Sequence, residues 1–445
     1  MTMLEKIKNY LLLLFFFLLP WQTVYIFDAK FIGGAKWQYG SGLIFATEIL
    51  LWLIALWQLA IIIKTKNPVI KIKKSRLLVT VSLWLLLAWS ILSLIWAPEK
   101  SAGFYNWFYL LEAAGLFFII LTSAINKNKI YLALTLAGVL QALLAIWQFM
   151  SQSIGAAKWL GIAGHLPWQS GEIIIEASGR WLRAYGAFVH PNVLGGFLVI
   201  CFFATIIPAL SIDGRRNTPW RIIAAMLISA GIFFSFSRSA WLALAIGMII
   251  IFIREIIFAK KSAEPINAQC RNLAKYFLAP LVLAIVLFFL YQPLVLTRTS
   301  TADRLEAKSV NERLAYLSQA GDVIKNHWLI GAGEGNYTYA LYQKNPNISA
   351  FYYQPVHNVF LLIFAELGIV GAAMFIIFLI SIFLNFLISN RTDKSGDSLN
   401  KIVFLTTILV IGCLDHYFWT SYVGLILLFM ALALILKKTS FNQKN

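Results

Sequence analysis

The chain has 445 residues, of which 60% are hydrophobic and only 13% are charged. Soluble domains carry about 25% charged residues, so the composition excludes an ordinary soluble fold and indicates an integral membrane protein. The formal net charge of +18 could suggest nucleic acid, but the Lys and Arg residues sort by side of a membrane, and no nucleic-acid partner is expected. The three cysteines are widely spaced and predict neither a disulfide framework nor a zinc knuckle.

Apolar runs long enough to cross a hydrocarbon layer as helices recur along the whole chain. The first run follows Lys6 and Lys8 like a signal peptide, but it lacks a small-x-small cleavage site and is expected to remain as the first span. We therefore expect an all-α bundle of about 12 transmembrane spans, surrounded by membrane lipids. The spans are expected near residues 10–27, 41–63, 77–96, 104–124, 130–150, 186–210, 221–236, 239–253, 276–297, 357–388, 402–418 and 420–436.

This assignment divides the chain into three parts. Residues 1–297 hold spans one to nine with short loops, residues 298–356 form one large loop, and residues 357–445 hold the last three spans and a tail. The connections on the side of both termini carry about twice as many Lys and Arg residues as the opposite side, and six of the thirteen residues at 64–76 are basic. The positive-inside rule then places both termini in the cytoplasm, and residues 151–186 and 298–356 outside.

Within the large loop, Leu314, Leu317 and Ile324 repeat with helical spacing. This spacing predicts a partly helical loop, with an amphipathic helix over residues 302–328. The glycine-rich run at 331–335 is expected to be a tight turn, because no parallel-sheet unit precedes it as a nucleotide-binding motif requires.

Polar residues gather where the outer segments meet the spans. In the first cluster, Arg183 precedes His190, Pro191 and Asn192. An arginine at the edge of a span is costly and usually faces a cavity or an anionic partner. The alternative is that the charged end of Arg183 reaches the membrane interface and that residues 190–192 begin a helix.

The second and third clusters each centre on an arginine. Arg238 lies between Ser237 and Ser239 in a short polar break between two apolar runs, and its forked guanidinium suits phosphate oxygens. Anchoring at the interface is the alternative for Arg238. Arg313 lies on the loop helix, where the alternative is an exposed ion pair with Glu312.

The fourth cluster begins where the large loop meets the tenth span. His357 can accept a proton near neutral pH, and nearby arginines would keep it unprotonated, whereas a structural histidine is the alternative. Asn358 follows it directly, and Gly368 and Gly371 lie on one helical face that permits close approach of another helix.

Four acidic residues fall in or beside the apolar runs, and hydrogen-bonded packing is expected for each, although any of them could mark an ion path. Because Glu366 lies nine residues after His357, the two side chains are expected on different helical faces. The four acids are Glu48, Glu112, Glu366 and Asp415.

Taken together, these clusters resemble the O-antigen ligase and O-antigen polymerase superfamily of bacterial polytopic glycan-transfer enzymes. His357 and Asn358, followed after nine residues by Gly368 and two residues later by Gly371, match the ligase signature at every fixed position. The Arg313 helix with its glycine turn, the break at Arg238 and the segment 183–192 are similar to the family's other shared segments.

The resemblance implies a glycan donor on a polyprenyl diphosphate, an acceptor hydroxyl on a glycan, glycolipid or protein, and a site on the outer face of the bacterial cytoplasmic membrane. It implies that His357 activates the acceptor while Arg183, Arg238 and Arg313 hold the diphosphate, with Arg180 as an alternative to Arg183. No cofactor and no metal are expected. The supporting residues are expected to be Asn358, His190, Asn192, Gly368 and Gly371.

Three functions other than ligation are compatible with parts of the sequence. A polymerase joining lipid-linked repeat units uses the same scaffold, and the residues do not separate it from a ligase. A lipid-linked glycan transporter or a structural scaffold would also fit the spans. Transporters commonly have two similar halves with sites near the midplane, whereas this chain gathers its polar residues at the outer face, which favours glycan transfer.

Overall fold

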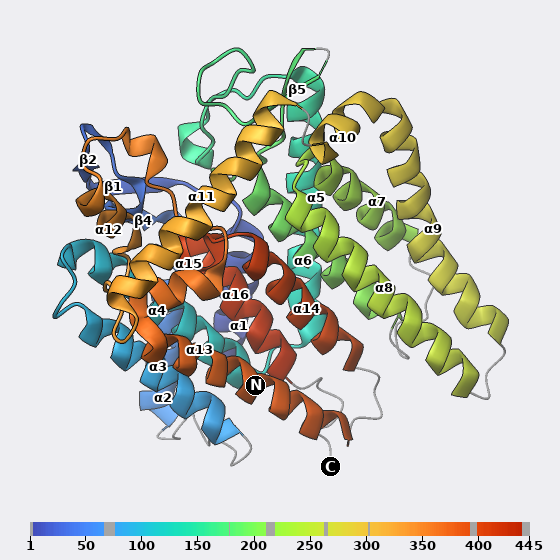
Figure 1. Ribbon diagram of the computed structural model, residues 1–445. Helices are drawn as coiled ribbons and strands as arrows, with labels where there is room; N and C mark the ends of the chain where they lie inside the picture. The colour runs from blue at the N-terminus through green and yellow to red at the C-terminus, as the bar shows by residue number, and fades with distance from the viewer. Residues whose placement is uncertain are drawn as a thin grey trace.

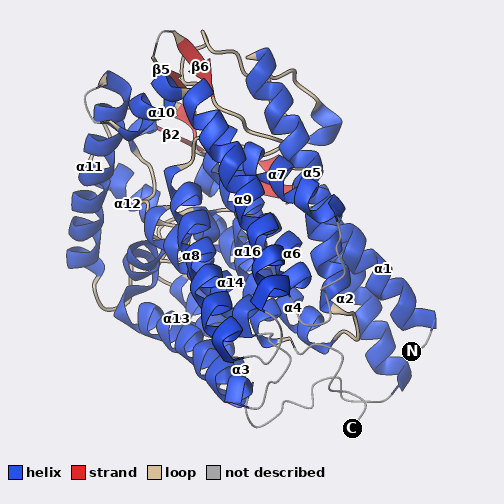
Figure 2. Ribbon diagram, turned by 90° about the vertical axis from the view of Figure 1, so that its right-hand side faces the viewer, coloured by secondary structure: helices blue, strands red, loops and turns tan. Residues whose placement is uncertain are grey.

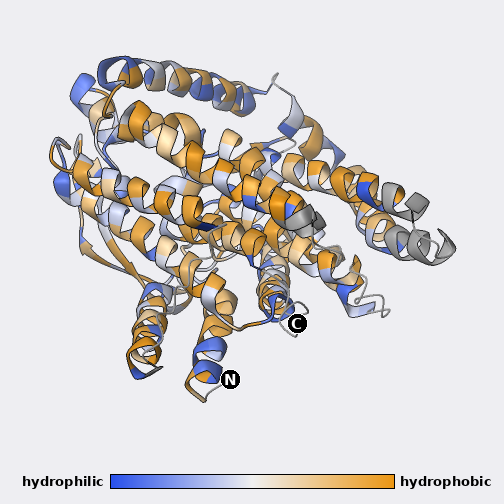
Figure 3. Cartoon of the chain, turned by 90° about the horizontal axis from the view of Figure 1, so that it is seen from below, coloured by the Kyte–Doolittle hydropathy of each residue, from blue (hydrophilic) through white to orange (hydrophobic). Residues whose placement is uncertain are grey.

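The computed structural model describes residues 3–65, 76–177, 179–210, 219–261, 266–300, 303–391 and 398–437. Long helices form most of this part of the chain and lie side by side (Figures 1 and 2). Most of their length is hydrophobic (Figure 3), as a helix bundle with the bilayer as solvent requires. The first half contains α1 (Met3–Leu18), α2 (Ala46–Thr65), α3 (Leu77–Ser93), α4 (Lys100–Thr122), α5 (Lys127–Ser151), α6 (Pro191–Leu210), α7 (Pro219–Phe234) and α8 (Arg238–Lys261).

The second half alternates long helices with short ones. Its helices are α9 (Ile266–Leu290), α10 (Gln292–Thr299), α11 (Arg304–His327), α12 (Tyr337–Lys344), α13 (Val359–Arg391), α14 (Ser398–Leu414), α15 (Tyr417–Thr420) and α16 (Tyr422–Leu436). Figure 1 shows α6 and α16 near the middle of the bundle. Every residue of α16 is buried, and α4 and α14 pack against it. A helix that is apolar all round can be surrounded in this way without leaving a charged side chain unpaired.

Six helices among the described residues are long and apolar enough to cross a membrane, and a seventh span results if the pair bent by 91° after Leu290 is counted as one. Shorter apolar helices, such as α3, α7 and α16, lie between them. The protein is therefore a multi-pass membrane protein, while the count of twelve spans and the large outer loop stay predictions. The six helical segments are Ala46–Lys64, Lys100–Thr122, Lys127–Ser151, Pro191–Leu210, Arg238–Ile256 and Val359–Ile388.

The chain is mostly helical, as predicted, but its first 50 residues also contain short strands. The run predicted as a span over 10–27 splits, because α1 ends at Leu18 and the chain continues into a strand. Pro20 does not favour continuation of the helix, and the β-branched and aromatic residues that follow suit a strand. The described residues contain three small antiparallel strand pairs: β1 (Val24–Asp28) with β4 (Gly42–Phe45), β2 (Phe31–Ile32) with β3 (Ala35–Lys36), and β5 (Ile174–Glu176) with β6 (Arg180–Leu182).

Hydrogen bonds between helix ends define one end of the bundle. The Lys8 ammonium donates to Gln58 Oε1 at 2.6 Å, and the Lys437 ammonium donates to the carbonyl oxygens of Ile120 and Ser123 at 2.8 and 2.7 Å. The start of α1 and the ends of α2, α4 and α16 therefore lie at this end. The polar clusters before α6, α8 and α13 lie at the other end.

The predicted amphipathic helix is present as α11, which crosses the front of the bundle in Figure 1 and lies at its left edge in Figure 2. The predicted turn after it is also present, with positive φ angles at Gly331, Gly333 and Gly335. This turn packs against a break in α13, where Gly368 has a φ of 67° and Ile369 N donates to Trp328 O at 2.8 Å. The glycine pattern predicted that a second helix would approach Gly368 closely. The backbone of this turn approaches it instead.

Candidate functional site

An open cavity of about 220 Å³ lies at the end of the bundle where the polar clusters meet. It is bounded by β5, the start of α6, the segment α10–α11 and the loop before α13. The polar lining joins arginines and histidines from segments that are far apart in the sequence. These polar residues are Glu172, Arg183, His190, Asn192, Arg298, Glu306, Ser309, Glu312, Arg313, Tyr316, Gln354 and His357.

Two arginines are held by the backbone between α7 and α8. Arg183 Nε donates to Ser235 O at 2.8 Å, and Arg298 Nε donates to Phe236 O at 3.0 Å. Arg183 is 3% exposed, so it does not extend to the membrane interface. Arg180, its alternative, is exposed and donates instead to Pro167 O at 2.7 Å.

Two arginines share one buried carboxylate. Glu306 lies 2.6 Å from Arg298 Nη1 and 3.5 Å from Arg238 Nη1, and Arg238 Nη2 also lies 3.5 Å from Ser309 Oγ. Each guanidinium has five N–H donors and one charge, so a single carboxylate leaves donors and positive charge unmatched. Glu306 therefore orients Arg298 and Arg238 but does not neutralise both of their positive charges.

Arg313 reaches the same cavity from α11. The alternative of an ion pair with Glu312 is not what the structure has, because Glu312 lies 3.7 Å from Lys308 Nζ, one turn back on the helix. Burial, and then the charge of Arg298, lowers the pKa of Arg183 well below its ordinary value. An anion bound in the cavity would relieve this repulsion.

His357 lies between the arginines of the cavity and the residues that follow α14. Its ring is parallel to that of Tyr316 at 5.9 Å and edge-on to that of His416 at 5.0 Å. Its Nδ1 is buried and has no hydrogen-bond partner among the described residues. Burial lowers the pKa of His357, Asp415 opposes this shift, and Arg313 adds to it. The imidazole is therefore neutral at pH 7 and able to accept a proton.

Asp415 connects His357 to the arginines. Asn192 Nδ2 donates to Asp415 Oδ2 at 2.8 Å, and Arg183 Nη2 donates to Asn192 Oδ1 at 2.8 Å. The Asn192 backbone N–H donates to Nδ1 of His190 at 3.0 Å. Burial raises the pKa of Asp415, but the neighbouring histidines and Arg313 outweigh it and lower the pKa overall. Asp415 is therefore ionised beside the imidazoles.

The remaining signature residues lie behind the cavity. Asn358 Oδ1 accepts from Leu361 N at 3.0 Å, and its Nδ2 donates to Cys413 O at 3.2 Å. These bonds cap α13 and join it to the end of α14. Gly371 lies on α13 beyond the break, where an added Cβ would lie 2.2 Å from Leu367 Cβ and 3.1 Å from Trp89 Cδ1.

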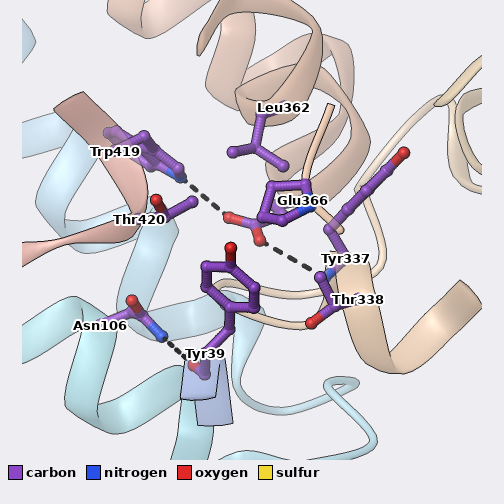
Figure 4. A pocket seen from close by; sticks show the side chains of 10 residues that line it. Tyr39, Asn106, Tyr337, Thr338, Leu362, Glu366, Trp419 and Thr420 are labelled. Carbon is purple, nitrogen blue, oxygen red and sulfur yellow. Dashed lines mark hydrogen bonds between the residues drawn. The ribbon is translucent and has the colours of Figure 1, made fainter. Parts of the chain in front are cut away.

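Glu366 lines a separate cavity of about 10 Å³, drawn in Figure 4. It accepts from Trp419 Nε1 at 2.8 Å and from Tyr337 N at 3.4 Å. His357 does not line this cavity, and the expected placement of the two side chains on different helical faces stays a prediction. Glu48 accepts from Phe45 N at 3.0 Å and Glu112 accepts from Trp52 Nε1, which agrees with the predicted hydrogen-bonded packing.

Several residues around the cavity were not predicted from the sequence. Hydrogen-bonded packing was expected for Asp415, yet Asp415 and the neighbouring His416 lie against His357. Asp415 and His416 are adjacent in the sequence and lie at the same outer boundary as the other clusters. This pattern could have indicated that they belong to the site. Arg298, Glu306 and Tyr316 were also missed, although Arg298 opens the loop that was expected to hold the site.

Comparison with known families matches residues 223–376 to the family model described as O-antigen ligase. The matched segment contains Arg238, Arg313 and His357, whereas Arg183 and Asp415 lie outside it. No curated protein matches the chain.

Proposed function

Because the chain belongs to the O-antigen ligase and polymerase superfamily, we propose that it moves a glycan from a polyprenyl diphosphate to an acceptor hydroxyl. The site is proposed to face the outer side of the bacterial inner membrane. One observation carries the proposal: Arg183, Arg238, Arg298 and Arg313 come from separate elements and meet around one cavity beside the imidazole of His357.

The arginines suit the diphosphate of the donor. Phosphate oxygens accept paired N–H donors from a guanidinium, and such charge-assisted bonds are about twice as strong as neutral ones. Arg298 and Arg238 share a single carboxylate, so a diphosphate would supply the missing negative charge. We therefore assign the diphosphate to the space between Arg183, Arg298 and Arg313.

A second cavity suits the prenyl chain of the donor. It has a volume of about 380 Å³, lies between α6, α7, α8 and α9, and is lined mainly by apolar side chains. Trp241 and Val295 line it, and each is three residues from Arg238 or Arg298 on the same helix. Met248 lies seven residues beyond Trp241, which is about 10 Å along α8. A prenyl chain in this cavity would keep its diphosphate beside the arginines.

In the proposed reaction, the acceptor oxygen bonds to the anomeric carbon of the donor glycan with inversion. The bond from that carbon to the phosphate oxygen breaks, and the polyprenyl diphosphate leaves with the electron pair. His357 takes the acceptor's proton, an effect that typically contributes about 10²–10⁴-fold. The guanidiniums stabilise the charge on the leaving diphosphate, so the step is proposed to need no divalent metal.

Ligation and polymerisation share this donor step. A ligase delivers the glycan to a glycolipid or protein hydroxyl, and a polymerase delivers it to a second lipid-linked repeat unit. The arginines and the apolar cavity act on the donor in both cases. Supplying each acceptor class separately to the purified protein distinguishes the two activities.

The test compares two arginines of α11 in the full-length protein, reconstituted with a labelled polyprenyl diphosphate glycan and an acceptor. Arg313→Lys keeps the charge but loses the forked donors, so we expect covalent transfer to fall at least about 10-fold. Arg304→Lys is the matched control, because Arg304 is exposed and pairs with Glu176 at 2.9 Å. Equal transfer by both variants, or movement of the lipid across the membrane without transfer, would contradict the proposal.

A further inference from the structure

Three side chains at the end of α14 have the composition of a metal-binding site. The possible ligand atoms of His357, Asp415 and His416 all lie within 4.8 Å of one another. Two imidazoles and one carboxylate form a donor set that first-row transition metals favour. Metal–ligand bonds of about 2.0–2.2 Å place tetrahedral ligands roughly 3.3 Å apart, so small side-chain rotations would close the set.

Each of the three groups has a free position for a metal. Nδ1 of His357 is buried and has no partner among the described residues. His416 has its Nδ1 at 2.8 Å from Thr420 Oγ1, which leaves its Nε2 to coordinate. The Asp415 oxygens accept from Asn192 Nδ2 and from the His416 backbone N–H, and a carboxylate oxygen can take a second partner.

The surroundings also suit a bound ion. Metal ligands are characteristically held by outer hydrogen bonds, and Asn192 and Thr420 provide such bonds to Asp415 and His416.

We propose that His357, Asp415 and His416 bind one transition-metal ion such as Zn²⁺, and that the bound ion inhibits glycan transfer. A metal bound to His357 occupies the lone pair that would otherwise accept the acceptor's proton. Transfer therefore stops while the ion is bound and resumes when a chelator removes it. The inhibitory half of this proposal rests on the proposed function, whereas metal binding itself does not.

Binding is measured first, without substrate, on the purified full-length protein. Titration with Zn²⁺ in a calorimeter, and with Co²⁺ followed by its visible absorption, should each give one tight site per chain. Loss of an outer hydrogen-bond partner alone weakens metal binding by at least about 10-fold. Because His416→Gln and Asp415→Asn each remove a ligand, they should weaken binding by at least that factor. His327→Gln is the control, because His327 is exposed at the end of α11. Size-exclusion chromatography checks that each variant is folded.

A wild-type protein that binds neither ion, or ligand variants that bind as tightly as His327→Gln, would overturn the site. A variant that fails to fold is replaced by Thr420→Val, which removes only the outer bond to His416 and should also weaken binding.

Inhibition is measured next by adding Zn²⁺ to the transfer assay. Wild type should lose activity over the concentration range in which it binds, and a chelator should restore it. Binding without inhibition, or activation by Zn²⁺, would overturn the inhibitory role and leave the site in place. Binding by a protein that transfers no glycan to any acceptor would instead contradict the proposed function alone.

Discussion

His357 is neutral because it is buried and faces Arg313, and these influences outweigh the attraction of Asp415. The direction of the pKa shift makes a prediction about pH. A base works when unprotonated, and its pKa lies below the ordinary value of about 6.5, so kcat/KM should be constant from pH 8 down to about 6.5. It should fall as the pH drops further, through the lowered pKa. A rate that falls as the pH rises from 6.5 to 8 would contradict this.

Substitutions at two neighbours of His357 should shift the pH at which kcat/KM falls in opposite directions. Asp415 raises the pKa of His357 and Arg313 lowers it. In Asp415→Asn, kcat/KM should therefore begin to fall at a lower pH than in wild type. In Arg313→Gln, the remaining kcat/KM should begin to fall at a higher pH. Full pH profiles of kcat/KM for both variants check this. Shifts in the same direction would mean that the profile reports another group.

At the scale of single residues, Arg183, Arg238 and His357 were predicted because each lies in a polar cluster beside an apolar run. Arg313 was predicted from its place on the amphipathic loop helix. Asp415 and Glu306 were missed for a physical reason. Their roles depend on which elements meet in space: Asp415 comes from the corner between α14 and α15, and Glu306 contacts two arginines from other helices.

The break in α13 fixes α11, and with it Arg313, against the bundle. Gly368 has a φ of 67°, and an added Cβ would lie 2.3 Å from Leu329 O. Gly368→Ala should therefore destabilise the protein, since a non-glycine residue in such a conformation costs about 1–3 kcal/mol and the clash adds to this. Thermal unfolding in detergent should shift to lower temperature, and transfer should fall because Arg313 moves.

Gly321→Ala is the matched control for this experiment. Gly321 lies inside α11, and an added Cβ would have nothing within 4 Å. Alanine in a helix interior is favoured over glycine by about 0.5–1 kcal/mol, so this variant should unfold at the same or a higher temperature. A Gly368→Ala protein as stable as Gly321→Ala would show that the turn does not require glycine.

Periodicity predicted α11 well, because its apolar residues repeat at helical spacing over many turns. It failed at the first span, where an apolar run contains both α1 and β1. It also failed to predict the break at Gly368, because a single glycine in an apolar run is compatible with a continuous helix. That break depends on the turn at 331–335, which packs against it from a distant part of the sequence.

For the whole molecule, the charge bias predicts which end of the bundle faces the cytoplasm. Lys64 lies at the end of α2 and Lys344 at the end of α12, and the side chain of Lys344 is 48% exposed. In a variant without the native cysteines, Lys344→Cys should react with an impermeant thiol reagent in intact cells. Lys64→Cys should react only after permeabilisation. The reverse result would place the site away from an outer glycan pool.

The composition predicted a multi-pass membrane protein, because no soluble core could bury so much apolar surface. Apolar content alone did not identify both central helices, since α6 is about as apolar as α3 and α13, although α16 is more apolar than all three. The central position of α6 and α16 depends on packing with neighbours on every side.

The central claim is that His357 takes the acceptor's proton while the arginines hold the donor. The most direct measurement compares His357→Ala with His327→Ala as purified, folded, full-length proteins, recording donor binding and transfer in the same preparation. We expect both to bind the polyprenyl diphosphate glycan. His357→Ala should lose about 10²-fold or more of its transfer rate, whereas His327→Ala should keep its rate. A His357→Ala protein that binds donor and transfers at the wild-type rate would contradict the account.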